Sequence, residues 1–302
     1  MTSRFSWTSP DRLASRGNGH APQAKSTAYL LSARQRTRMA APAPFSLDEL
    51  RIAVESGEGL RVVAQPQFDL QTGKMASAEL LARWGRGAGE EVPPSQFIPA
   101  LRMMGIKSKL FNFVRLEAQN LLRTLVHANA VLPVAINASA ATLSIPGLLR
   151  NIDTDLRRHG IPASLLKLEI TEDTEADDIL TLASELSWMR GRGFGVSMDD
   201  FGMGASTLER LTRLPFSELK IDGSFVQRMQ AEPAARAVVG SSIDLGRRMG
   251  LTVVAEGVES TAHQQLLLEL GCRLGQGYGL GAPMELHDFV KKAVLESTAI
   301  AS

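Results

Sequence analysis

The sequence predicts a (β/α)8 barrel of the TIM type with one antiparallel strand near its start. From residue 45 onward, short apolar runs alternate with helical stretches, and this alternation implies right-handed crossovers and a parallel sheet. Eight strand candidates within roughly 250 residues favour a closed barrel. An open doubly wound sheet is the alternative, but no Gly-x-Gly-x-x-Gly turn follows the first strand.

The composition sets limits on function and location. The 302 residues are 44% apolar and 22% charged, with a net charge of +1, which is typical of soluble globular proteins. No apolar run approaches the roughly 20 residues of a membrane span, and the net charge does not indicate binding to a nucleic-acid polymer. The single cysteine, Cys272, excludes an intramolecular disulfide and suits the reducing cytoplasm, where we expect the protein.

Residues 1–44 differ in character from the rest. They hold seven basic side chains and one acidic side chain, so their charge is 7 − 1 = +6 and the remainder carries 1 − 6 = −5. They are rich in Ser, Arg, Ala and Pro and show no sustained apolar period. We therefore predict a disordered basic tail at 1–44 and a folded domain at 45–302. A misassigned start, with Met39 as the first residue, is an alternative.

The first predicted elements are a helix and a hairpin. Ser46 is suited to cap a helix. Leu60 to Gln65 reads as a strand that Pro66 stops, and Gly73 marks the turn before a returning strand at 75–84. This hairpin predicts the antiparallel strand.

The remaining elements alternate along the chain. Helices are predicted at 94–104, 107–128, 178–190 and 233–249. Strands are predicted at 132–137, 166–171, 195–200, 219–222, 252–256 and, more weakly, 272–278.

Polar residues mark the ends of nearly all these strands. They are Glu79 with Arg83, Asn137, Glu169, Asp199 with Asp200, Lys220 with Asp222, Glu256 with Glu259, and Gln276. In an α/β barrel these ends converge on one mouth, where barrel active sites lie. Each residue alone could be a cap, a turn or a surface charge. Polar, acid-rich ends on almost every predicted strand are hard to explain by a need for solubility alone.

Asp199 and Asp200 pose a geometric question. Strand alternation sends adjacent side chains to opposite faces. If both carboxylates serve one site, the strand must end and bend there, and Gly202 and Gly204 permit such a bend. The structural alternative is a solvated turn.

The converging carboxylates predict a metal site. Such a cluster repels itself, and hard divalent cations with oxygen ligands relieve the repulsion. Because no His or Cys lies at these strand ends, Mg²⁺ or Mn²⁺ is favoured over zinc. Five carboxylates and an amide suffice for two ions, the arrangement used in phosphoryl chemistry. Lys220 supplies one inward positive charge that could steady a hydroxide or a phosphoryl oxygen.

With these residues assembled, the chain resembles the EAL family of cyclic-di-GMP phosphodiesterases over about residues 46–296. The matching motifs are Gln65-Pro66, Glu79-Leu80-Leu81-Ala82-Arg83-Trp84, Asn137-Ala138-Ser139, Glu169 to Glu172, Asp199 to Gly202, Lys220 to Asp222, Ala255 to Glu259, and Gln276-Gly277-Tyr278. Together, in this order and spacing, they are very specific.

The resemblance implies a role for each matching residue. It implies metal ligation by Glu79, Asn137, Glu169, Asp199, Asp200 and Glu256, with catalysis by Lys220, Glu79, Asp200 and Glu256. Lys220 would assist the nucleophilic water, and Glu172 would anchor the loop after Asp200. The expected substrate or supporting contacts are Gln65, Arg83, Asp222, Glu259 and Gln276.

The resemblance also implies an activity and its partners. The expected reaction is hydrolysis of cyclic di-GMP to linear pGpG with two Mg²⁺ or Mn²⁺ ions, by a protein that dimerises with itself. Three positions depart from the family pattern: Leu80, Met203 and Ala205. The last two lie in a loop that the family uses for metal loading and dimer coupling, so weaker metal affinity or altered regulation is expected.

Three other functions stay open at this point. The altered loop supports a cyclic-di-GMP receptor without turnover. A protein-interaction module that keeps the fold without the ligand is the second. A metal-dependent barrel lyase with Lys220 as base would fit the acids, but it does not explain Gln65, Arg83 and Gln276 in these contexts.

Overall fold

A computed structural model describes residues 45–87, 89–170, 179–202 and 207–301. The predicted tail at 1–44 lies outside the described residues, as do Glu172, Met203 and Ala205. The predictions made for them stay predictions. No helix in the described ranges is both long enough and apolar enough to cross a membrane.

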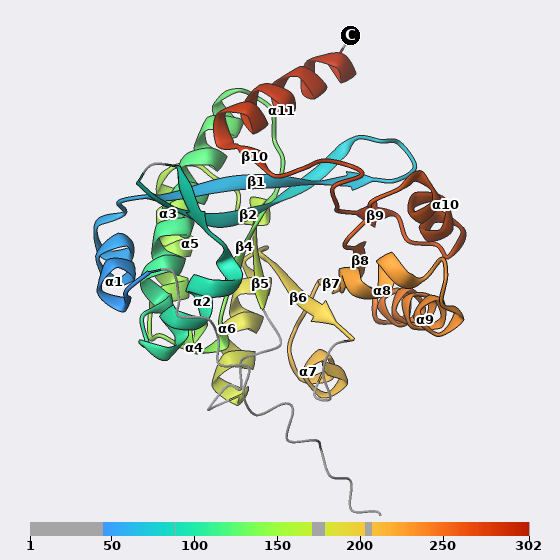
Figure 1. Ribbon diagram of the computed structural model, residues 1–302, viewed down its shortest axis with the longest axis horizontal. Helices are drawn as coiled ribbons and strands as arrows, with labels where there is room; N and C mark the ends of the chain where they lie inside the picture. The colour runs from blue at the N-terminus through green and yellow to red at the C-terminus, as the bar shows by residue number, and fades with distance from the viewer. Residues whose placement is uncertain (1–44, 88, 171–178, 203–206, 302) are drawn as a thin grey trace, which may run out of the picture. The chain divides into compact units, whose positions relative to one another are not determined.

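Eight strands close into a barrel (Figure 1). Around the barrel their order is β1-β9-β8-β7-β6-β5-β4-β2, and β2 pairs back with β1. β1 is antiparallel to both its neighbours, whereas every other neighbouring pair is parallel. The predicted barrel with one early antiparallel strand is therefore confirmed, and the closed order excludes the open sheet.

The strands are close to their predicted positions. The barrel strands are β1 (Leu60–Asp69), β2 (Met75–Arg86), β4 (Val134–Ala138), β5 (Leu166–Ile170), β6 (Gly195–Phe201), β7 (Glu218–Ile221), β8 (Thr252–Ala255) and β9 (Leu274–Gly275). Two short strands that the sequence did not predict are β3 (Glu90–Val92), which pairs with β2, and β10 (Met284–Glu285), which pairs with β1.

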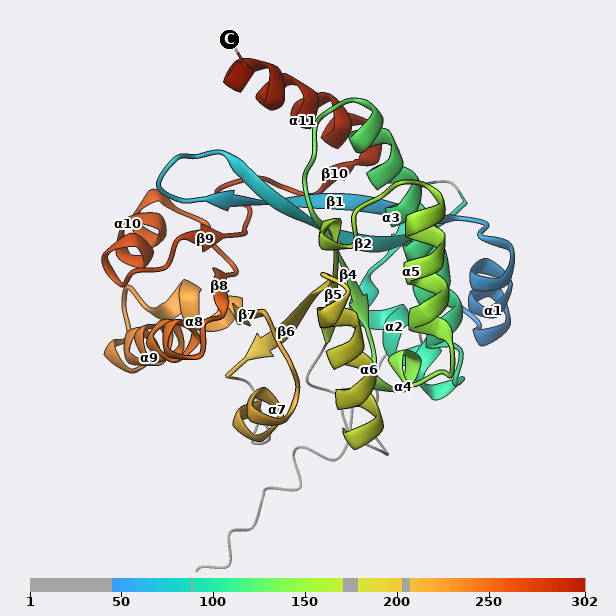
Figure 2. The same ribbon diagram turned by 180° about the vertical axis from the view of Figure 1, so that it is seen from behind.

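Helices cover the outside of the barrel (Figures 1 and 2). They are α1 (Leu47–Ser56), α2 (Pro94–Met103), α3 (Lys107–His127), α4 (Ala140–Leu143), α5 (Leu148–Arg158), α6 (Ile179–Gly191), α7 (Thr207–Arg213), α8 (Gly223–Arg228), α9 (Pro233–Met249), α10 (Thr261–Glu269) and α11 (Leu286–Ala301), with a 3-10 turn at Ala163–Leu165. One continuous apolar core fills the space between strands and helices.

Local sequence explains several helix ends. Ser46 caps α1 in a capping box with Glu49, and Gly57 ends α1 in the left-handed conformation. Ser139 caps α4 by accepting a hydrogen bond from the Thr142 amide. The predicted capping by Ser46 is thus confirmed.

The prediction that Pro66 stops the first strand is wrong. β1 continues to Asp69, and Pro66 pairs with Ala78 of β2. On its other side, β1 pairs with β10 at Val63–Ala64 and with β9 at Phe68–Asp69. Pro66 lies in the gap between those two pairings, where a missing N–H is tolerated. The longer strand brings Gln65 and Gln67 to the same face of β1.

Candidate active site

Lys220 lies at the centre of the candidate site and is fully buried. Its ammonium nitrogen lies 2.7 Å from Glu256, 2.8 Å from Glu169, 3.0 Å from Asp199 and 3.1 Å from Glu79. These carboxylates come from β2, β5, β6 and the end of β8. Residues far apart in the sequence therefore gather at one end of the barrel, because parallel strands present their carboxyl ends on the same side.

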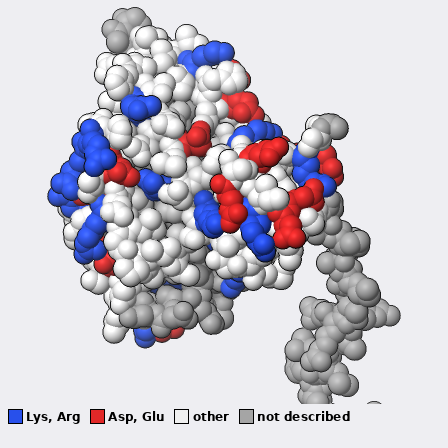
Figure 3. Space-filling model, turned by 90° about the vertical axis from the view of Figure 1, so that its left-hand side faces the viewer, with Lys and Arg blue, Asp and Glu red and all other residues white. Residues whose placement is uncertain are grey.

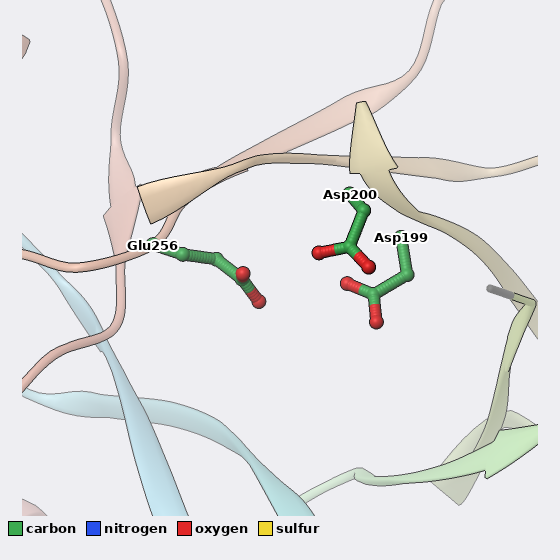
Figure 4. A group of neighbouring side chains, drawn as sticks. All are labelled: Asp199, Asp200 and Glu256. Carbon is green, nitrogen blue, oxygen red and sulfur yellow. The ribbon is translucent and has the colours of Figure 1, made fainter. Parts of the chain in front are cut away.

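A bulge brings Asp199 and Asp200 to the same site. The β6–β7 register shifts between Met198 and Phe201, and Asp200 takes a left-handed backbone with φ of 54°. This conformation reverses the ordinary alternation of side chains. The carboxylates of Asp199 and Asp200 point toward Glu256 (Figure 4), and one oxygen of each lies within 4.8 Å of the others.

The predicted bend therefore exists, but Asp200 itself makes it. We expected glycines to supply the unusual backbone. Gly202 does have a φ of 110°, but the strand already turns at Asp200. Gly204 lies outside the described residues. Asp tolerates a positive φ better than most side chains, so the sequence pair Asp-Asp is compatible with this bulge.

Burial and charge shift the proton equilibria of the cluster. Burial alone would lower the pKa of Lys220, but the charges of Asp199, Glu169, Glu256 and Glu79 raise it well above its ordinary value. The ammonium group therefore stays protonated and is the charge that holds these acids together.

The pKa values of the acidic side chains are shifted in opposite directions. Burial and the neighbouring Glu79 charge raise the pKa of Glu169 well above its ordinary value. Burial is also the main cause that raises the pKa of Glu256 to about 8 and of Asp200 to about 6. The pKa of Glu79 is lowered, because Lys220 and the hydrogen bonds that Glu79 accepts outweigh its burial. One lysine thus does not balance all the acids.

The model of the EAL domain family matches residues 47–283 of this chain. The chain belongs to the EAL domain family. It is 34% identical over 247 residues to the cyclic di-GMP phosphodiesterase RocR of Pseudomonas aeruginosa, covering 82% of this chain and 62% of RocR. It is 38% identical over 242 residues to the bifunctional diguanylate cyclase/cyclic di-GMP phosphodiesterase MucR of the same organism, covering 79% of this chain and 35% of MucR.

Solved structures agree with this assignment. The structure of the PaMucR phosphodiesterase in complex with c-di-GMP has a TM-score of 0.74 and 36% identity, over 80% of this chain and 98% of that chain. The EAL enzyme Bd1971, bound to cAMP and cyclic-di-GMP, has a TM-score of 0.76 and 29% identity, over 81% of this chain and 67% of that chain. The chain spans about three fifths of the length of RocR and about a third of the length of MucR.

The acid cluster of this EAL domain has the chemistry of a divalent metal site. Asp199, Asp200 and Glu256 offer three converging carboxylate oxygens. Glu169 Oε1 is buried and accepts no hydrogen bond from the described residues, and the buried Asp199 Oδ1 faces the Lys220 ammonium nitrogen at 3.0 Å. Unpaired buried carboxylate oxygens are costly, and oxygen donors of this kind suit Mg²⁺ or Mn²⁺. The residues present therefore fit a divalent cation.

Asn137 and Gln276 support Glu79 from either side. Asn137 Nδ2 donates to Glu79 Oε1 at 2.7 Å, and Gln276 Nε2 donates to Glu79 Oε2 at 2.9 Å. Gln276 Nε2 also reaches Gln65 Oε1 at 3.2 Å. The structure therefore brings Asn137, Gln276 and Gln65 into the neighbourhood of the cluster, as the sequence predicted.

Three other predicted residues have different partners. Arg83 lies on the same face of β2 as Glu79, but it contacts the Ala82 carbonyl at 2.9 Å and Glu91 at 3.6 Å. Asp222 caps α8 by accepting from the Ser224 amide, and its charge contributes to the raised pKa of Asp200.

Glu259 is the third of these residues. Its carboxylate accepts a hydrogen bond from Gln227 Nε2 at 2.7 Å. None of the three contacts Lys220 directly among the described interactions. Their predicted contacts with a substrate stay predictions.

Sequence reasoning missed two residues of the site, Gln67 and Ser77. Both are buried; Ser77 donates a hydrogen bond to Gln67, and Gln67 donates one to Gln276. The period-two pattern of strands could have found them, since Gln67 follows Gln65 by two residues and Ser77 precedes Glu79 by two. Ending the first strand at Pro66 hid Gln67.

Proposed function

We propose that this chain hydrolyses one phosphodiester bond of cyclic di-GMP to give linear pGpG, with Mg²⁺ or Mn²⁺ as cofactor. The observation that supports this most is the convergence of four carboxylates from four strands on Lys220, beside the Asp199–Asp200–Glu256 group. RocR and MucR, whose names include cyclic di-GMP phosphodiesterase, are at least 34% identical to it.

The chain's residues would share the work of the reaction. Glu79, Asn137, Glu169, Asp199, Asp200 and Glu256 are the proposed holders of the cations. When bound, two divalent cations lower the pKa of water and stabilise negative charge on phosphoryl oxygens. Lys220 keeps the carboxylates together and faces the attacking water with a positive charge.

The reaction balances as a simple hydrolysis. The oxygen of water attacks phosphorus in line, the bond from phosphorus to the 3′ oxygen breaks, and that oxygen takes up a proton. Arg83 is the proposed phosphate contact because its planar guanidinium offers several donors. Gln65, Asp222, Glu259 and Gln276 are the proposed substrate or supporting contacts. Glu172, outside the described residues, keeps its proposed role in anchoring the loop after Asp200.

The proposal also includes the binding partners and the location of the chain. We propose a cytoplasmic homodimer, with cyclic di-GMP as substrate. The face shown in Figure 3 carries positive and negative side chains interspersed, without a broad basic area. That pattern does not favour binding of a nucleic-acid polymer to this face.

Substitution of Glu79 tests the function. In Glu79→Ala, the purified protein with Mn²⁺ should lose formation of pGpG by at least about 100-fold. Glu90→Ala is the matched control, because Glu90 lies on β3 with a side chain that is 57% exposed. An active Glu79→Ala variant would overturn the proposed mechanism.

Binding distinguishes the enzyme from the alternatives. The receptor alternative depends on Met203 and Ala205, which lie outside the described residues. Calorimetry with cyclic di-GMP and Ca²⁺ should show binding to the wild-type chain. Binding without turnover in Mn²⁺ would establish the receptor, and absence of both would favour the interaction module.

A further inference from the structure

A chain of hydrogen bonds runs inside the barrel from Ser77 to Glu79. Ser77 Oγ bonds to Gln67 Oε1, and Gln67 Nε2 lies 2.9 Å from Gln276 Oε1. Gln276 Nε2 lies 2.9 Å from Glu79 Oε2. Gln67 is fully buried, Gln276 is 4% exposed and Ser77 is 3% exposed. Solvent therefore does not compete for these groups.

The strand register builds this chain. In the β1–β2 pairing Gln67 lies opposite Ser77, and Gln65 lies opposite Glu79. Residues two apart on a strand share a face, so all four side chains lie on the same side of the hairpin. Gln276 follows β9, the other neighbour of β1, and its amide closes the arrangement.

The chemistry of the groups fixes the direction of every bond. An ionised carboxylate only accepts hydrogen bonds, so Gln276 must turn its NH2 group toward Glu79. The Gln276 oxygen then needs a donor, and the NH2 group of Gln67 is the donor within reach. The Gln67 oxygen is left facing Ser77, whose hydroxyl can donate.

We propose that Gln67 is a positioning residue for the metal site. It fixes the orientation of the Gln276 amide and, through it, of the Glu79 carboxylate, while Ser77 fixes Gln67. The proposal rests on the proposed metal binding by Glu79, which can be measured without turnover, and on the proposed hydrolysis only for its kinetic readout. Groups that hold a metal-ligating side chain commonly affect metal affinity 10- to 100-fold.

The first test is Gln67→Met, which keeps the size of the side chain and removes its donor. The Gln276 oxygen then loses its Gln67 donor, and the amide is held only through its NH2 group, by the acceptors Glu79 and Gln65. We expect the Kd for Mn²⁺, measured by calorimetry, to rise about 10-fold. A crystal structure of this variant should show the Gln276 side chain displaced from its wild-type position beside Glu79.

Gln67→Glu tests the direction of the chain. Position 67 then bears only acceptors when it is ionised, so it competes with Glu79 for the NH2 group of Gln276. We expect the affinity for Mn²⁺ to fall further than in Gln67→Met. Affinity equal to that of the wild-type chain would contradict the proposal.

Two serine variants complete the series. Ser77→Ala frees Gln67 to rotate and should raise the Kd for Mn²⁺ by less than Gln67→Met does. Ser242→Ala is the matched control, because Ser242 is also buried but bonds to the Val238 carbonyl on α9. It should leave the Kd unchanged. Ser77→Ala also keeps the proposal testable if the position-67 variants fail to fold.

The kinetic readout separates positioning from a general loss of stability. With substrate saturating, Gln67→Met should need a higher Mn²⁺ concentration for half-maximal rate, and excess Mn²⁺ should restore the rate. A folded Gln67→Met variant with wild-type Mn²⁺ affinity and an unmoved Gln276 would overturn the proposal. A wild-type chain without turnover would overturn the proposed function instead and leave the Mn²⁺ binding series as the test.

Discussion

Lys220 offsets part of the negative charge in the barrel interior. Four carboxylates lie within 3.1 Å of its ammonium nitrogen. Removing one partner of a buried ion pair leaves uncompensated charge, which costs more than the pair contributes. The folded state without metal therefore depends on this one residue, and a divalent cation would share its role.

This dependence predicts the behaviour of Lys220→Met. Without metal, the free energy of unfolding, measured in urea, should fall by about 3 kcal/mol. Mn²⁺ at about 1,000 times its Kd should return about 4 kcal/mol. Lys109→Met is the control, because Lys109 pairs with Glu55 at the surface, and it should change stability by less than about 0.5 kcal/mol. Equal stability of Lys220→Met and the wild-type chain without metal would contradict this account.

Asp200 combines a left-handed backbone with a carboxylate that points into the candidate site. Its φ of 54° lies in the left-handed region, which Asn and Asp tolerate better than other side chains with a Cβ atom. The strain is retained because it turns the Asp200 carboxylate into the site. The predicted roles of Asp200 in function and in conformation can therefore be separated by substitution.

We predict that Asp200→Asn and Asp200→Ala both lose hydrolysis but differ in stability. Asp200→Ala should be less stable than Asp200→Asn by about 1 kcal/mol in urea unfolding, because Ala pays the full cost of the left-handed conformation. At Asp48, within helix α1, we expect the opposite order of stability. Asp48→Ala should be more stable than Asp48→Asn, because Ala has a higher helix propensity than Asn. The same order at both positions would argue against backbone strain at Asp200.

The elements around the site are held together by close approaches of backbone at the strand ends. A Cβ atom at Gly279 would lie 2.4 Å from the Glu259 carbonyl carbon, which is too close for any real contact. Gly279 follows β9, and Glu259 lies in the connection from β8 to α10. These two connections therefore pack through their backbones beside the site.

Gly279→Ala should accordingly be destabilising. We expect a loss of about 2 kcal/mol in the free energy of unfolding, because the backbone of one connection must move. Gly87→Ala serves as control, since nothing lies within 4 Å of a Cβ atom there, and its effect should stay within about 0.5 kcal/mol. Similar stabilities of the two variants, measured by urea unfolding, would contradict the close packing.

The barrel strands were predicted from the sequence, whereas the two short strands β3 and β10 were not. Periodicity and flanking turn residues located all eight barrel strands, because these signals are local. β3 and β10 were missed because each is short and takes its place only by pairing with a distant segment. The prediction at Pro66 was wrong because a strand tolerates proline where it changes pairing partners. No local sequence pattern reveals where β1 does so.

At the scale of the whole molecule, barrel closure turns scattered sequence positions into one site. The carboxylates that meet Lys220 span positions 79 to 256. Their convergence could be predicted, since parallel strands direct their carboxyl ends to one mouth. The left-handed backbone of Asp200, the partners of Arg83 and the buried Gln67 could not, because each depends on register and contacts that exist only in the folded chain.

The most direct measurement follows Mn²⁺ binding and cyclic-di-GMP turnover in the same preparation of purified chain. Calorimetry should give two Mn²⁺ ions bound per chain, and chromatography should show cyclic di-GMP converted to pGpG, with conversion stopped by a chelator and restored by Mn²⁺. A folded chain that binds no Mn²⁺ and leaves cyclic di-GMP intact would contradict the proposal that these carboxylates hold metal ions for phosphodiester hydrolysis.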